Sequence, residues 1–159
     1  MCIIVDNNVV HAVVMGDGVK EDLALLASDF KASSGKARLV YGGYLAVEYA
    51  QSRSLLRKLI SLEREGRARQ VPLGLYNREK ELVERKGECT SNDAHVIAVA
   101  RAGNVRLLCT DDALLKQDFK NSNLIAGGKV YSSSNNHNLI AQCCKSIGQP
   151  KKKQGKKRR

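Results

Sequence analysis

The sequence predicts an α/β fold with a central, mostly parallel sheet. Short, mostly apolar runs lie at 2–5, 38–41 and 105–109, and the first of them is continuous and rich in β-branched residues. Such runs are typical of strands that are buried on both faces. Helical apolar patterns separate these runs, so strands and helices alternate along the chain. With 159 residues, 43% of them hydrophobic, the chain is long enough for one domain with its own core.

The first half of the chain begins with a strand that ends at Asp6. The elements expected up to residue 73 are a strand at 2–5, a helix at 9–15, a helix at 20–32, a strand at 38–41, one long helix at 44–62 and a short peripheral extended segment at 71–73. Asn7 or Asn8 is expected to cap the helix at 9–15, and Gly16 to end it.

The second half is mostly helical around one further buried strand. The elements expected there are helices at 78–86 and 92–102, a strand at 105–109, a helix at 113–120, an edge strand at 129–131 and a final helix at 137–145. Residues 1–146 are therefore interpreted as one domain. Residues 147–159 are interpreted as a disordered basic tail, because they hold too few apolar side chains to pack.

The charge is strongly positive. The chain has 27 Lys and Arg against 16 Asp and Glu, a net charge of +11. Seven of these cations gather at the end of the chain: Lys151, Lys152, Lys153, Lys156, Lys157, Arg158 and Arg159. This run is either a solvated tail or an arm that binds phosphates of nucleic acid. A second basic stripe is expected beside the long helix, formed by Arg53, Arg57, Lys58, Arg64, Arg67 and Arg69.

The cysteines predict a reducing environment. The chain has five Cys, an odd number, and no two of them are spaced as C-x-x-C. We therefore expect free thiols, with Cys2 and Cys109 in the core, and a cytoplasmic location. No stretch approaches the roughly 18 apolar residues of a membrane span, so no membrane partner is expected.

Four acidic positions carry the candidate chemistry. Asp6 directly follows the first strand, and Asp112 follows the strand at 105–109. Asp93 begins the helix before that strand, and Glu48 lies near the start of the long helix. In a parallel α/β sheet the carboxyl ends of the strands meet at one edge, where ligands bind. We therefore expect these acids to converge, and position alone leaves both Asp112 and its neighbour Asp111 open for the last place.

Converging carboxylates need a counter-charge to stay ionised together. Mg²⁺ and Mn²⁺ prefer oxygen ligands and commonly combine carboxylates with water and substrate phosphate. Such a site suits hydrolysis of phosphodiester bonds. Scattered His and unspaced Cys argue against zinc, and the chain has neither a P-loop nor a recognisable nucleophile elbow.

The same motifs resemble the PIN-domain nucleases, a family that includes VapC-type toxins. The resemblance covers about residues 2–131, and it rests on Asp6-Asn7-Asn8 after the first strand, Glu48 in a helix, Asp93 with its apolar helix, and Thr110-x-Asp112 after the last core strand. It implies a three-layer α/β/α fold and an endoribonuclease that uses Mg²⁺ or Mn²⁺. Asp6, Glu48, Asp93 and Asp112 would hold the metal, with Thr110 and Asn8 supporting them.

The resemblance also implies two kinds of partner. Relatives often form homodimers, and a toxin would pair with an antitoxin protein that covers the acidic groove. The basic tail and the segment 63–73 depart from the family pattern, which leaves the toxin subtype open.

Other readings of the same residues remain open. Asp6, Asp93 and the pair Asp111-Asp112 each stand where helix N-caps occur, and Glu48 alone fits a solvated helix face. His95 either approaches the substrate or only packs within its helix. The alternative functions are a nucleic-acid-binding module without activity, and a nuclease for DNA or structured substrates.

Overall fold

The computed structural model describes residues 2–141. Within these residues one sheet has the strand order β3-β2-β1-β4-β5, and every neighbouring pair is parallel. The strands are β1 (Cys2–Val5), β2 (Arg38–Tyr41), β3 (Ala68–Gln70), β4 (Leu107–Cys109) and β5 (Lys129–Val130). The expected α/β class with a mostly parallel sheet is therefore confirmed.

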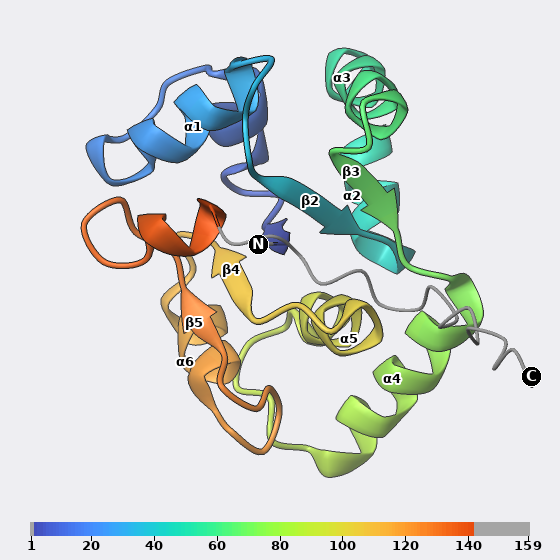
Figure 1. The fold of residues 1–159 in the computed structure, drawn as a ribbon. Coiled ribbons are helices and arrows are strands. Elements are labelled where there is room, and N and C mark those ends of the chain that lie inside the picture. Colours follow the sequence, from blue (N-terminus) through green and yellow to red (C-terminus); the bar gives the residue numbers. More distant parts are fainter. Residues whose placement is uncertain (1, 142–159) are drawn as a thin grey trace, which may run out of the picture.

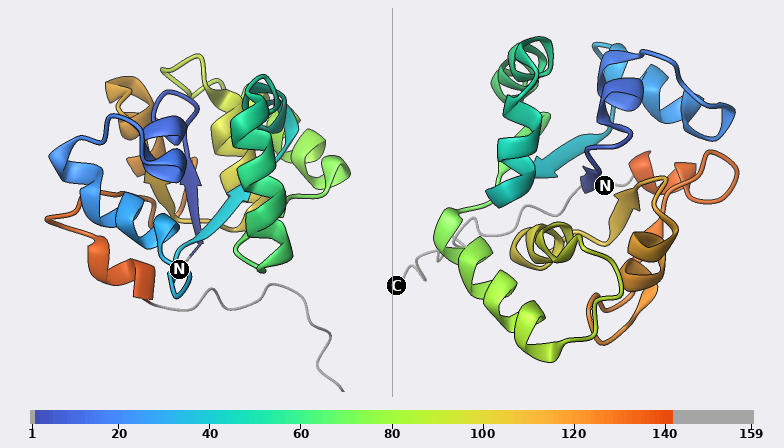
Figure 2. Two further views of the ribbon diagram at one scale, coloured as in Figure 1. Left: turned by 90° about the horizontal axis from the view of Figure 1, so that it is seen from above. Right: turned by 180° about the vertical axis from the view of Figure 1, so that it is seen from behind.

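Helices cover both faces of the sheet. They are η1 (His11–Met15, π-helical), η2 (Glu21–Leu23, 3-10), α1 (Ala24–Lys31), α2 (Gly43–Ala50), α3 (Arg53–Arg64), α4 (Leu73–Lys86), α5 (Ala94–Gly103), α6 (Ala113–Lys120) and η3 (His137–Ala141, 3-10). Figures 1 and 2 show α1 and η1 on one side of the sheet and α4 and α5 on the other. This arrangement agrees with three layers.

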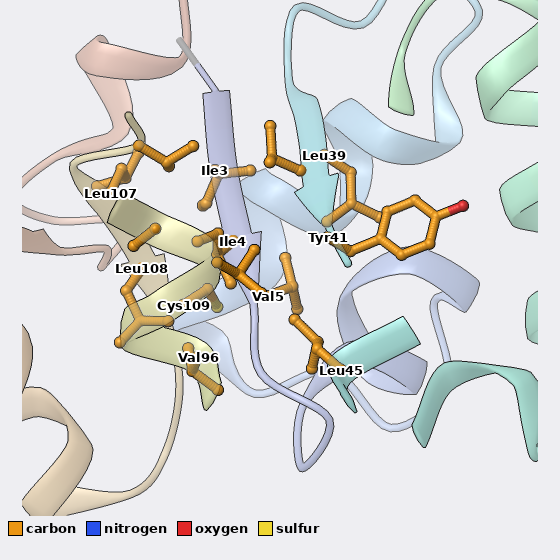
Figure 3. Close-up of a cluster of buried hydrophobic side chains, with 14 of the residues drawn as sticks. Ile3, Ile4, Val5, Leu39, Tyr41, Leu45, Val96, Leu107, Leu108 and Cys109 are labelled. Atoms are coloured by element: carbon orange, nitrogen blue, oxygen red, sulfur yellow. The ribbon is translucent and has the colours of Figure 1, made fainter. Parts of the chain in front are cut away.

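The core is built around β1, the middle strand. Ile3, Ile4 and Val5 are fully buried, and β2 and β4 flank them with further apolar residues (Figure 3). Each fully buried Val, Leu or Ile contributes roughly 1.5–3 kcal/mol relative to an exposed one. Leu45 of α2 and Val96 of α5 are also fully buried in this core. The core therefore fixes both helices relative to the end of β1.

The single long helix expected at 44–62 is wrong, because the chain forms α2 and α3 with a break at Gln51 and Ser52. Ser52 has an extended backbone, with φ −104° and ψ 117°, and its hydroxyl accepts a hydrogen bond from the amide of Leu55. This is an N-cap, so it ends one helix and begins the next.

The segment 63–73 also differs from the expectation. Ala68–Gln70 forms β3, an edge strand of the sheet, and α4 begins at Leu73 rather than at residue 78. Arg69 and Gln70 are exposed, because an edge strand faces solvent and carries little apolar pattern. The expected cap of η1 by Asn7 or Asn8 is wrong as well, because Val10 stands at the N-cap without a side-chain hydrogen bond.

The cysteine prediction is correct in part. Cys89 and Cys109 are free, and Cys109 is fully buried in β4. Cys2, however, is disulfide-bonded, so a free thiol in the core is wrong for this residue. It stands at the start of β1 and is only partly buried. None of the helices among residues 2–141 combines the length and apolar character needed to cross a membrane.

Candidate active site

Asp6 and Thr110 meet where β1 and β4 end. Val5 pairs with Cys109 in the parallel register, and the amide of Asp6 donates to the carbonyl of Cys109 at 2.9 Å. The hydroxyl of Thr110 then donates to Oδ2 of Asp6 at 2.7 Å. Asp6 is 6% exposed and Thr110 is 4% exposed. The sheet therefore holds a carboxylate in a nearly buried position at its carboxyl edge.

Glu48 reaches this edge through α2. Gly43 has φ 51° and lies against the ring of Tyr76, where a Cβ atom would clash, so glycine lets the chain turn from β2 into α2. The hydroxyl of Tyr49, a fully buried residue, donates to the carbonyl of Val5. This bond ties α2 to the end of β1 and places the neighbouring Glu48 beside Asp6.

Asp93 stands at the N-cap of α5, but its side chain makes no capping hydrogen bond. The capping interpretation of this residue is therefore wrong. Within residues 2–141 the Asp93 carboxylate has no hydrogen-bond or ion-pair partner. It is partly buried, and it lies close enough to Asp6 for its charge to raise the pKa of Asp6.

The three acids Asp6, Glu48 and Asp93, here called the acid cluster, repel one another. Burial raises the pKa of Asp6, and the charges of Asp93 and Glu48 raise it further, while hydrogen bonds from Thr110 and the amide of Asn7 lower it. The net result is a pKa above the usual range. Ionising Asp6 at neutral pH therefore costs the folded protein free energy, because burial and the two neighbouring charges disfavour its charged form.

Asp112 and Asp111 have different roles in the fold. Oδ1 of Asp112 accepts from the amide of Leu115 at 2.9 Å, so this carboxylate caps α6. The amide of Asp112 bonds to the hydroxyl of Thr110 at 3.1 Å, which keeps Asp112 beside the Thr110–Asp6 pair. Asp111 is exposed and forms an ion pair with Lys20 at 2.8 Å. Asp112 is therefore the better placed of the two.

Asn8 lies on the surface. Asn8 is exposed, and within the described part of the chain its side chain makes no hydrogen bond to the acid cluster. The amide that does reach Asp6 belongs to Asn7, at 2.8 Å from Oδ1. The expected supporting role of Asn8 is therefore not borne out by any side-chain hydrogen bond to these acids in the described residues.

Two residues near the acid cluster were not assigned to it from the sequence. Nε2 of His95 lies 3.1 Å from Oε2 of Glu48, and the His95 ring meets the edge of Tyr44. Asp118 of α6 is 1% exposed and accepts hydrogen bonds from the segment that leads into Asp93. Both contacts join elements far apart in the chain, so no local pattern could reveal them.

The acid cluster has the chemistry of a divalent cation site but not yet its geometry. Within residues 2–141 no Lys or Arg forms an ion pair with Asp6, Glu48 or Asp93. A cation with oxygen preference would relieve the repulsion among them. In the same residues no group of three or more His, Cys, Asp or Glu side chains stands close enough together to hold a metal.

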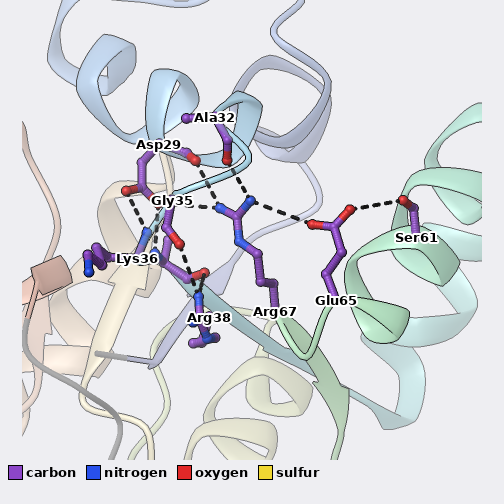
Figure 4. Close-up of polar contacts among 9 residues, drawn as sticks. Asp29, Ala32, Gly35, Lys36, Arg38, Ser61, Glu65 and Arg67 are labelled. Carbon is purple, nitrogen blue, oxygen red and sulfur yellow. Dashed lines mark hydrogen bonds and ion pairs between the residues drawn. The ribbon is translucent and has the colours of Figure 1, made fainter.

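The expected basic stripe is wrong in part. Arg67 is 4% exposed; it donates to the carbonyls of Asp29 and Ala32 at 2.8 Å and pairs with the carboxylate of Asp29 at 3.6 Å (Figure 4). Arg69 donates to the carbonyl of Gly103. These two arginines hold the fold together, whereas Arg53, Arg57 and Arg64 of α3 are exposed. The seven cations at 151–159 lie outside the described residues.

Comparisons with known proteins give no identification. No model of a protein family matches the chain, and no curated protein matches it. A functional assignment must therefore rest on the fold and on the chemistry of the acid cluster.

Proposed function

We propose that this protein is a PIN-like, metal-dependent endoribonuclease. The observation that carries the proposal is the acid cluster: a nearly buried Asp6 whose pKa is raised by burial and by the charges of Asp93 and Glu48, at the carboxyl edge of a parallel sheet. Ligands of open α/β sheets bind at this edge. The excess of basic residues favours a polyanionic substrate. The motif resemblance favours RNA.

The residues divide into ligands and supports. Asp6, Glu48 and Asp93 would hold Mg²⁺ or Mn²⁺, with Asp112 as the fourth acid. Such an ion, when bound, lowers the pKa of a water molecule and neutralises charge on phosphate oxygens. Thr110 holds the Asp6 carboxylate by its 2.7 Å hydrogen bond, and His95 holds Glu48. Because each carboxylate oxygen can accept more than one bond, these hydrogen bonds leave lone pairs on Asp6 and Glu48 for a further ligand.

One observation favours a second candidate, a nucleic-acid-binding module without activity. The acids of residues 2–141 are not gathered into a ready metal site. The net charge of +11 would still bind phosphates without any cleavage. This candidate gives no reason for a nearly buried, repelling set of acids, which costs stability and is common at catalytic sites.

The test is cleavage of single-stranded RNA, single-stranded DNA and RNA hairpins in Mg²⁺, in Mn²⁺ and in EDTA. We expect RNA to be cut only with a metal. Asp6→Asn and Asp93→Asn should each lower the rate at least about 100-fold, because even groups that only support a ligand commonly cost 10–100-fold. Asp111→Asn, which changes an exposed acid of the same edge, is the matched control and should cut normally.

Three other results of the cleavage test would contradict part or all of the proposal. If the wild type cuts no substrate with either metal, the nuclease proposal is rejected and the binding module is favoured. If DNA or the hairpin is cut and single-stranded RNA is not, the substrate class is wrong. If the Asn variants cut as fast as the wild type, the acids have been assigned wrongly.

A further inference from the structure

Asp118 is a buried carboxylate with an unusually complete set of hydrogen bonds. It lies in α6, and Oδ1 accepts from the amide and the hydroxyl of Thr90 at 2.8 and 2.7 Å. Oδ2 accepts from the amide and the hydroxyl of Ser91 at 2.9 and 2.6 Å. Burial alone raises the pKa of Asp118, but these four hydrogen bonds outweigh it, so the pKa lies below the usual range.

Ser91 continues this network to Asp93. Its hydroxyl donates to Asp118 and accepts from the amide of Asp93 at 3.3 Å. The segment from Thr90 to Asp93 is therefore pinned on one side to α6 and on the other to the first turn of α5. Ser91 is 8% exposed, so water competes little with these bonds.

The network explains why Asp93 is available to the acid cluster. An N-cap residue commonly turns its side chain back onto the amides of its own helix, as Asp112 does for α6. Asp93 does not, although it stands at the N-cap of α5. Its backbone, at φ −106° and ψ 36°, is held instead by the Ser91 hydroxyl. The carboxylate accepts no hydrogen bond within residues 2–141, and its charge raises the pKa of Asp6.

We propose that Asp118 and Ser91 are positioning residues that hold the Asp93 carboxylate against Asp6. This inference rests on the proposed function, because it gives the network a role in metal binding. A carboxylate suits the position since all four groups facing it are donors and it can only accept. Neither Asp118 nor Ser91 touches the metal or the substrate, so both act through Asp93.

The first arm of the test compares Ser91→Ala with Thr90→Val, using Mn²⁺ alone and isothermal titration calorimetry. Both variants remove one hydroxyl from Asp118, but only Ser91→Ala also removes the contact to Asp93. We expect Ser91→Ala to weaken Mn²⁺ binding about 10–100-fold, the usual cost of losing a group that orients a metal ligand. Thr90→Val should stay within about twofold of the wild type, and Ser91→Thr, which keeps a hydroxyl, should restore most of the affinity.

A merely structural role would give a different pattern. Both Ser91→Ala and Thr90→Val would then lower the melting temperature and leave Mn²⁺ affinity unchanged, which would overturn the proposal. In a double mutant, Ser91→Ala should add little to the loss caused by Asp93→Asn. Full additivity of the two losses would also count against a shared action through Asp93.

The second arm needs no metal. In a crystal structure of metal-free Ser91→Ala, we expect the Asp93 carboxylate to have moved away from Asp6. An unmoved carboxylate would overturn the positioning role. If the wild type binds no Mn²⁺ at all, the proposed metal site fails, yet this second arm still decides whether Ser91 positions Asp93.

Discussion

The imidazole of His95 lies 3.1 Å from the carboxylate of Glu48 and links α5 to α2 across the carboxyl edge of the sheet. The His95 side chain is 9% exposed and the Glu48 side chain 21% exposed, so the pair is shielded from bulk water. An ionised carboxylate has no proton to give, so Nε2 must be the donor whenever Glu48 carries its charge. It fixes Glu48 on the side of the acid cluster.

Replacing His95 should therefore affect both stability and activity. We expect His95→Ala to cost about 1–3 kcal/mol of folding free energy, the usual range for leaving a buried polar partner unsatisfied. Cleavage should fall about 10–100-fold as Glu48 loses its support. His95→Gln, which keeps a donor, is the control and should recover part of the activity. A folded His95→Ala protein that cleaves at the wild-type rate would show that Glu48 needs no support.

Neutralising Asp6 should separate stability from activity. The folded-state pKa of Asp6 lies above its unfolded value, so its ionisation destabilises the fold as pH rises from the unfolded to the folded pKa. At pH 7 we therefore expect Asp6→Asn to gain about 0.5–2 kcal/mol, a common range when a strained functional group is relaxed. At a pH below both pKa values this gain should vanish. Urea unfolding at the two pH values measures the difference.

Without metal, Asp6→Asn is expected to be more stable than the wild type, and added Mn²⁺ should reverse this order of stability. A ligand that binds only the folded state raises its stability in proportion to the logarithm of ligand concentration over the dissociation constant. Added Mn²⁺ should therefore raise the melting temperature of the wild type much more than that of Asp6→Asn. Equal shifts for both proteins would mean that Mn²⁺ binds elsewhere.

Asp112 needs two variants because its carboxylate also caps α6. Asp112→Ala should cost about 1 kcal/mol through the lost cap, whereas Asp112→Ser should keep most of the stability because serine is a good N-cap. If Asp112 belongs to the site, both variants should lose cleavage. Normal cleavage by Asp112→Ser, with wild-type stability, would show that Asp112 is only a helix cap.

Asp111→Asn breaks an exposed ion pair with Lys20, so we expect it to lower the free energy of unfolding by no more than about 1 kcal/mol.

Asp118→Asn should reveal a pH-dependent contribution to stability. The pKa of Asp118 is lower in the folded state, so its contribution is full above the unfolded pKa, near 4, and is lost as pH falls through the folded pKa. At pH 7 the variant should lose about 3 kcal/mol, because an amide group turns a donor toward the donors of Thr90 and Ser91. The difference from the wild type should shrink in acid. A difference that does not change with pH would show that Asp118 carries no folded-state charge.

The strands and helices with strong local patterns were predictable from the sequence. β1, β2 and α6 have the expected bounds, because short apolar runs mark the two strands locally and an acidic N-cap marks the helix. The split between α2 and α3 depends on one capping serine inside an otherwise helical pattern. β3 was missed because its exposed edge residues carry no apolar alternation, and only its pairing with β2 makes it a strand.

The site residues likewise divide into those that a local sequence pattern predicts and those that only tertiary contacts reveal. Asp6 and Asp112 could be proposed from their places after strands, since a parallel sheet brings such positions together. The support of Glu48 by His95 and of the Asp93 segment by Asp118 could not, because these contacts span 47 and 27–28 residues of sequence. Tertiary packing creates them, and neither residue type at its position has a local signature. The prediction for Asn8 was wrong although it followed a local motif, because Asn8 is exposed in the folded chain.

The proposed metal site on Asp6 and Asp93 is tested most directly by calorimetric titration with Mn²⁺ at neutral pH. The proteins to compare are the wild type, Asp6→Asn, Asp93→Asn and Asp111→Asn. We expect the wild type and Asp111→Asn to bind Mn²⁺ with the same affinity. Asp6→Asn and Asp93→Asn should each bind at least about tenfold more weakly, because each loses a charged ligand. Equal binding by all four proteins, or no binding by the wild type, would contradict a metal site built on Asp6 and Asp93.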